Sequence, residues 1–324
     1  MRSLILPALK MTIAAIVTIL ITSALDLQYA TTAGVIALLS IQSTKKESFK
    51  MAFKRIIISL IALALSGALF YAFGFYIIVF GVFLIIFIPL AYLVKMQEGL
   101  VVATVLVTHL LVEAKFSILL NEVLILIIPV MIALIVNLYM PNSEQKLMKK
   151  EAEIDKSISN ILANIAKALQ KELSWTILNE ELDLAKEMVN KALEDASYYH
   201  NNLLFNNSEY HLNYLFMRNT QLEYLSRIAK YFERIIEVYP VSIDIARFVA
   251  TLKNDIGYKD MATIRLEELK GMREDMKSLP LPKERTEFEN RAMLYQILNE
   301  LEEFLFVKIQ FHQNNDHLYC KIRP

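Results

Sequence analysis

The 324-residue sequence contains one cysteine, one tryptophan and seven glycines. Because Cys320 is the single thiol, the chain has neither an internal disulfide nor a cysteine-based zinc site. It also lacks a glycine-rich phosphate loop and a nucleophile with a matching base, which argues against an enzyme and against a bound cofactor. His200 and His211 flank a polar turn, but no third ligand has suitable spacing, so we assign no metal.

Charge is unevenly distributed along the chain, although the formal net charge is zero. The first 140 residues hold nine Lys or Arg and five Asp or Glu, which leaves 25 basic and 29 acidic residues for the remainder. The neutral total therefore hides a mildly basic first part and a mildly acidic second part. An acidic second part argues against a nucleic-acid partner.

The first part consists mostly of apolar runs that are typical of membrane helices. A helix that crosses the hydrocarbon core needs about 20 residues, or fewer where neighbouring helices cover it. We predict an all-α fold with a six-helix transmembrane domain over residues 1–141, embedded in a lipid bilayer. Its six spans are 4–25, 29–43, 56–73, 75–94, 99–112 and 118–140.

Positive residues beside these spans predict the orientation, because short loops rich in Lys and Arg stay on the cytoplasmic side. Arg2, Lys95, the 45–55 loop and the 146–150 run then lie on one side of the membrane. An even number of spans satisfies all of them. We therefore predict a multi-pass protein of the cell membrane, with both termini in the cytoplasm.

The second part has helical periodicity throughout. From Ser143, apolar residues recur every three or four positions, and further amphipathic stretches cover 179–205, 208–238, 242–256, 260–278 and 283–313. Pro240 and the LPLP turn at 279–282 separate them. We predict a cytoplasmic antiparallel helical bundle over residues 142–324. Small residues between Ala62 and Ala68 are compatible with a compact membrane bundle or a dimer face, and we expect a homo-oligomer, with a dimer favoured.

Polar residues and positive charges gather around the second predicted span. Hydroxyl and amide groups at this density are typical of a water-lined path, and Arg55 is expected to open the third helix, where its planar guanidinium can grip a carboxylate at two points. Together with Lys10 it makes the cytoplasmic mouth positive, which favours a small organic anion as substrate. The candidate substrate-binding residues are Lys10, Ser40, Gln42, Thr44 and Arg55.

His109 and Glu113 lie four positions apart in the fifth predicted span, on one helical face. A buried histidine beside a carboxylate is able to carry a proton, because small shifts move its titration across neutral pH. A structural hydrogen bond to a neighbouring helix explains the same spacing. Both readings stay open, and we treat His109 and Glu113 as a possible proton relay.

Four separated segments resemble the bacterial aromatic acid exporter family, which belongs with the fusaric-acid-resistance type of membrane proteins. The resemblance implies a six-helix membrane domain in the bacterial cell membrane, a helical cytoplasmic domain, and efflux of aromatic carboxylic acids. The segments are LKMTIAA around Lys10, AGVIALLSIQSTKKESFKMAFKR at 33–55, NEVLILIIPVMIALIVNLYMP at 121–141 and LPLPKERTEFENRAMLYQILNELEEFLFVK at 279–308.

Two other functions fit the same sequence features. A passive anion channel would also need several membrane helices with a positive mouth. Alternatively, the membrane part would be only an anchor for a helical sensor or scaffold. The polar residues of the second span argue against the anchor, because an anchor does not need them.

Overall fold

The structure, a computed structural model, describes residues 2–139, 144–204, 209–235, 237–257 and 260–322, and side chains from residue 5 to residue 315 within these ranges. Every regular element in these ranges is a helix, which confirms the all-α prediction. Met1–Pro141 and Asn201–Phe205 group into one compact unit, whereas Asn142–His200 and Asn206–Pro324 form a second. The predicted domain boundary between residues 141 and 142 lies outside the described ranges.

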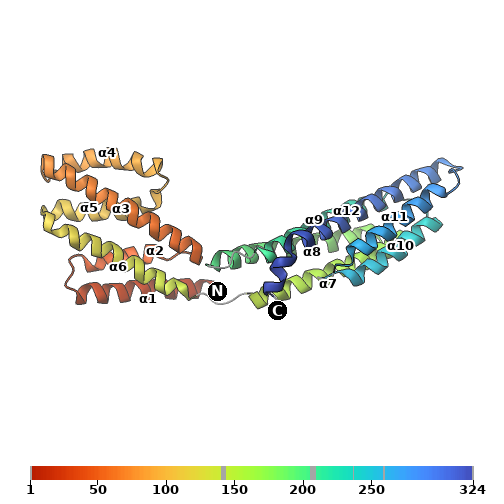
Figure 1. Cartoon of the computed structure of the whole chain (residues 1–324), viewed down its shortest axis with the longest axis horizontal. Helices are drawn as coiled ribbons and strands as arrows, with labels where there is room; N and C mark the ends of the chain where they lie inside the picture. Colours follow the sequence, from red (N-terminus) through yellow and green to blue (C-terminus); the bar gives the residue numbers. More distant parts are fainter. Residues whose placement is uncertain (1, 140–143, 205–208, 236, 258–259, 323–324) are drawn as a thin grey trace. The chain divides into compact units, whose positions relative to one another are not determined.

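The first unit is apolar on its outside and partly polar inside. Ile78 and Leu93 are largely exposed, whereas Thr18, Ser59 and Glu122 are fully buried. α2 packs against α1 and α6, and α3 packs against α4, α5 and α6 (Figure 1). The α-helices in the described part of this unit are α1 (Arg2–Ala24), α2 (Ala30–Ser40), α3 (Lys45–Phe73), α4 (Ile77–Leu93), α5 (Leu100–Glu113) and α6 (Leu119–Leu138).

Three segments of this unit are long and apolar enough to cross a membrane, rather than the six that we expected. They are Ile5–Ala24, Lys45–Phe73 and Phe116–Leu138. By contrast, α2, α4 and α5 have 11, 17 and 14 residues. At about 1.5 Å per residue they extend roughly 17, 26 and 21 Å, less than the roughly 30 Å of the hydrocarbon core.

The start of α3 corrects a second prediction. The basic stretch 45–55 is not a loop, because α3 begins at Lys45 and Arg55 lies about three turns inside it. The side chain of Thr44 accepts a hydrogen bond from the backbone N–H of Glu47 and so caps the N-terminus of α3. Over 29 residues, α3 is about 44 Å long and therefore exceeds the thickness of the hydrocarbon core.

The second unit is a bundle of amphipathic helices around an apolar core, close to the predicted ranges. α9 and α12 lie side by side, α7 packs against α9 and α10, and α11 packs against α12 (Figure 1). Ile158, Leu182, Leu222 and Leu298 are among the fully or almost fully buried core residues. The α-helices described are α7 (Glu144–Leu169), α8 (Trp175–Asn202), α9 (Tyr210–Phe232), α10 (Pro240–Leu252), α11 (Ala262–Ser278) and α12 (Arg285–Ile322).

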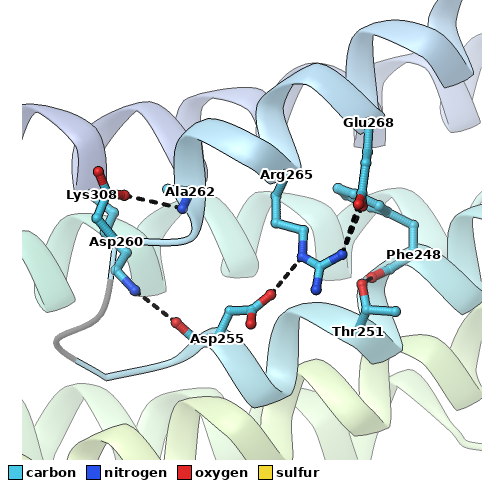
Figure 2. A network of polar contacts seen from close by, with 8 residues as sticks. All are labelled: Phe248, Thr251, Asp255, Asp260, Ala262, Arg265, Glu268 and Lys308. Atoms are coloured by element: carbon cyan, nitrogen blue, oxygen red, sulfur yellow. Dashed lines mark hydrogen bonds and ion pairs between the residues drawn. The ribbon is translucent and has the colours of Figure 1, made fainter.

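A polar network fixes the connection between α10 and α11 (Figure 2). Lys308 of α12 donates a hydrogen bond from Nζ to the carbonyl oxygen of Asp255 at 2.7 Å. The Asp255 carboxylate pairs with Arg265 at 2.6 Å, and Arg265 also pairs with Glu268 at 2.8 Å. Lys308 is almost fully buried, and burial together with the nearby Arg218 charge lowers the pKa of Lys308 to about 8.

Candidate functional site

Arg55 of α3 is a buried cation that lies beside the C-terminal end of α2. Its side chain donates a hydrogen bond from Nη1 to Ser40 Oγ, and Ser40 donates in turn to the carbonyl oxygen of Ile36 at 2.6 Å. Arg55 is only 4% exposed, and its Nε has no hydrogen-bond acceptor among the described residues. Within the same ranges no carboxylate pairs with it. The negative end of the α2 dipole favours a cation here but does not replace an acceptor.

Gly99, directly before α5, allows the helices to approach closely at this point. A Cβ atom at Gly99 would lie 2.3 Å from Ile58 Cγ2 and 3.1 Å from Arg55 Cα. Any side chain there would push α3 and the start of α5 apart. The glycine therefore helps to hold the backbone of Arg55 in place.

Lys10 reaches the same end of α2 from the opposite side, on α1. It is 6% exposed, and its Nζ donates to Asn137 Oδ1 at 3.1 Å. The Asn137 amide donates to the carbonyl oxygen of Gln42 at 3.0 Å and to Ser48 Oγ. Asn137 thus connects α1, α3 and α6 to the segment after α2. We call Lys10, Ser40, Ser48, Arg55 and Asn137 the basic cluster.

The predicted substrate-binding residues divide into two groups in the structure. Lys10, Ser40 and Arg55 place their side chains in the basic cluster. Gln42 contributes its carbonyl oxygen, while its side-chain amide donates back to the Leu39 carbonyl at 3.5 Å. Thr44 caps α3. The sequence reasoning missed Asn137 and Ser48, although Asn137 was visible as a polar residue within an apolar helix.

A second group of polar residues lies at the opposite end of α2, and we call it the carboxylate cluster. It consists of Tyr29, His109, Glu113, Asn121 and Glu122. His109 Nδ1 lies 2.8 Å from Glu122 Oε2, and Glu122 is fully buried. The Tyr29 ring stacks on the imidazole with 3.8 Å between ring centroids and 6° between planes, and its hydroxyl donates to Glu113 at 3.0 Å.

The partner of His109 differs from the predicted one. α6 places Glu122 against the imidazole, whereas Glu113 accepts a hydrogen bond from Tyr29. The Asn121 side-chain amide donates to the other oxygen of Glu122 at 3.1 Å and to the Gln28 carbonyl oxygen, and its Oδ1 accepts from the Gln28 backbone N–H. The four-residue spacing of His109 and Glu113 in α5 therefore did not identify the partner of His109, because that contact depends on how α6 packs.

Buried hydroxyl groups lie on α1 and α3 as well. Ala14, Thr18 and Thr22 follow Lys10 at every fourth position of α1 and are fully buried. In the described part of the chain, Thr18 Oγ1 and Ser59 Oγ have no hydrogen-bond partner. Since native proteins leave few buried polar atoms unmatched, these hydroxyls are compatible with contact to a polar solute.

Two family models together match almost the whole chain. Residues 5–140 match "Aromatic acid exporter family member 1", and residues 144–309 match "Putative aromatic acid exporter C-terminal domain". The chain belongs to the aromatic acid exporter family. This confirms the resemblance found in the sequence and places the chain in a family of membrane transporters.

The chain is similar to a curated protein of Bacillus subtilis and to a solved structure from Clostridium difficile. It is 32% identical to YqjA of Bacillus subtilis (strain 168), described as uncharacterized, over 296 residues that cover 90% of this chain and 91% of YqjA. The "Crystal structure of putative membrane protein from Clostridium difficile 630" aligns with a TM-score of 0.46 at 23% identity, and covers 52% of this chain and 99% of that one.

Proposed function

We propose that the protein is a carrier of the bacterial cell membrane that exports aromatic carboxylates or related organic anions, and that the basic cluster binds the carboxylate. Membership of the aromatic acid exporter family supports the substrate class. The basic cluster supports an anion site, because it contains two buried cations, Lys10 and Arg55.

The state of Arg55 carries this proposal. A buried charge without a counter-charge costs several kcal/mol, yet in the described ranges Arg55 has only the Ser40 hydroxyl as acceptor and its Nε is unmatched. A carboxylate has two oxygens at the spacing of the guanidinium edge and would satisfy Nε in a charge-assisted hydrogen bond. Lys10 adds a second positive charge on the far side of Asn137.

The proposed topology places all six helices of the first unit in the membrane, with α2, α4 and α5 partly shielded by the longer helices. The positive-inside rule then places both termini, the basic cluster and the 142–324 domain on the cytoplasmic side. A negative interior drives an anion outward by about 2.3 kcal/mol per charge per 100 mV. We further propose that the protein works as a homo-oligomer, with a dimer favoured.

Efflux from reconstituted vesicles tests the proposal. The full chain should release labelled benzoate and hydroxylated benzoates at a saturable rate above that of protein-free vesicles. Arg55→Gln should abolish this release, whereas Lys115→Gln, which removes an exposed charge outside the basic cluster, should not. No release of any aromatic carboxylate by the wild type would reject the proposal, and large unitary currents would identify a channel instead.

A further inference from the structure

We propose that Glu122 and His109 form a proton-binding site that controls the end of the pathway opposite the basic cluster, and that Tyr29 is the lid over it. This inference rests on the proposed export function and deepens it, since it names the residues through which external protons act on transport.

Glu122 is a buried carboxylate that contacts an imidazole. The carboxylate is fully buried within the Phe116–Leu138 span, where an isolated negative charge is strongly disfavoured. His109 is its one titratable contact among the described residues, at 2.8 Å, and Asn121 adds a neutral donor at 3.1 Å. With one proton shared between carboxylate and imidazole, the pair is neutral as a whole. Loss of that proton leaves a buried negative charge.

The Tyr29 ring separates this pair from Glu113. It covers one face of the imidazole at 3.8 Å, a contact that strengthens when the imidazole is positive. Its hydroxyl donates to Glu113, which is only partly buried. The titratable groups around the pair are therefore Tyr29, which contacts it from the segment before α2, and Glu113 of α5, which faces it through Tyr29.

The backbone at Tyr29 favours a movable lid. Its φ of 62° and ψ of 33° lie in the left-handed region, which is disfavoured for a side chain of this size. The stack on His109 and the hydrogen bond to Glu113 hold it there. Release of both contacts would let the backbone relax and would uncover the buried pair.

The protonation step moves one proton and no other group. A proton from the external side binds to the unprotonated pair, and the neutral pair then holds Tyr29 in the closed position. When the proton leaves, Glu122 is negative close to a negative Glu113, and repulsion favours the open position. External protons therefore close the outer end after the anion has left, which makes the return step depend on external pH.

Efflux of labelled benzoate into media of pH 5.5 to 8.5 tests the inference, with internal pH fixed, membrane potential clamped and protein-free vesicles subtracted. Wild-type efflux should rise about tenfold as external pH falls. Glu122→Gln, a permanent mimic of the protonated acid, should bind benzoate but show slow, pH-independent efflux. Asp26→Asn is the control, because it removes an exposed carboxylate between α1 and α2 that lies outside the carboxylate cluster, and it should keep the pH dependence.

Two results would overturn the inference while leaving export intact, namely wild-type efflux that does not depend on external pH, or a Glu122→Gln variant with the wild-type pH dependence. If Glu122→Gln fails to bind benzoate, His109→Gln decides in the same assay, where a flat profile supports the site and a wild-type profile rejects it. If the wild type exports no benzoate at any pH, the proposed function itself fails. Tyr29→Phe, which keeps the stack on His109 but loses the hydrogen bond to Glu113, should leak less than Tyr29→Ala, which loses both contacts.

Discussion

Two buried arginines, one in each unit, have very different surroundings. Arg218 in the second unit is fully buried, pairs with Asp155 at 2.8 Å, and donates to Gln221 at 2.7 Å and to Tyr214 at 2.8 Å. Arg55 in the first unit is 4% exposed and donates to the Ser40 hydroxyl, and no carboxylate pairs with it in the described ranges. Arg218 therefore has a built-in carboxylate partner, whereas Arg55 is the residue that we propose binds the carboxylate of the substrate.

The largest expected effect is a loss of transport when Arg55 is replaced. Arg55→Gln should lower the kcat/KM of aromatic carboxylate efflux by about 100-fold or more, because loss of one partner of a buried charge pair costs about 2–5 kcal/mol. Thermal unfolding in detergent should be unchanged or shift upward, since an unpaired charge is removed. Arg55→Lys should recover part of the activity, because an ammonium keeps the charge but loses the planar fork. Unchanged efflux in Arg55→Gln would contradict the proposed difference in role between Arg55 and Arg218.

The second effect concerns stability. Arg218→Met should destabilise the second unit by about 3 kcal/mol, because the partly buried Asp155 would remain without its counter-charge. The double variant with Asp155→Leu should regain most of the stability that Arg218→Met loses. Urea unfolding of the full chain in detergent, followed by circular dichroism, measures both. The comparison would fail if Arg218→Met unfolded like the wild type while losing efflux.

A third effect tests Lys308, a further buried cation of the second unit. Its folded-state pKa of about 8 lies below the ordinary value of 10.5. Between pH 8 and 10.5, Lys308 carries its proton in the unfolded chain but has largely lost it in the folded chain, so the free energy of unfolding rises with pH in this range. Below pH 8 the folded chain must bury the charged form, which is unfavourable. The wild type minus Lys308→Met difference in unfolding free energy should rise by about 3 kcal/mol from pH 7.5 to 10.5.

The matched control for this titration is Lys270→Met, whose side chain is half exposed. Its difference from the wild type should stay nearly constant over the same pH range. If the difference in unfolding free energy between the wild type and Lys308→Met does not change with pH, burial does not disfavour the charged form of Lys308.

The smallest effect concerns Asn137, which joins Lys10 to Ser48 and to the carbonyl oxygen of Gln42. Asn137→Leu keeps the volume but removes the acceptor for Lys10 and the donors to Gln42 and Ser48. We expect a KM for efflux about tenfold higher, because one charge-assisted hydrogen bond contributes about 1.5–3 kcal/mol. The maximal rate should change little. A lower maximal rate at unchanged KM would place Asn137 in the conformational step instead.

Much of the helical architecture was predictable from local pattern. The repeat of Ile154, Ile158 and Ile161 gave α7, and apolar runs gave the helices of the first unit. The start of α3 was missed because the charge of the 45–55 stretch outweighed the Thr44 capping signal. The number of full-length spans was overestimated, since apolar composition alone does not fix helix length.

The candidate site was only half predictable. Lys10 and Arg55 stood out because cations are rare in apolar segments. Their partners did not, because Asn137 reaches Lys10 across 127 positions and Glu122 reaches His109 only through the packing of α6 on α5. Such contacts depend on how the helices pack, which the spacing of residues within one helix does not predict.

Equilibrium binding of benzoate to the purified full chain tests the central claim most directly, with uncharged benzamide as the comparison ligand. The wild type should bind benzoate at least about tenfold more tightly than benzamide, as expected for one charge-assisted contact. Arg55→Gln should lose this preference while Lys115→Gln keeps it. Benzoate binding by Arg55→Gln with wild-type affinity would contradict the assignment of Arg55 as the carboxylate-binding residue.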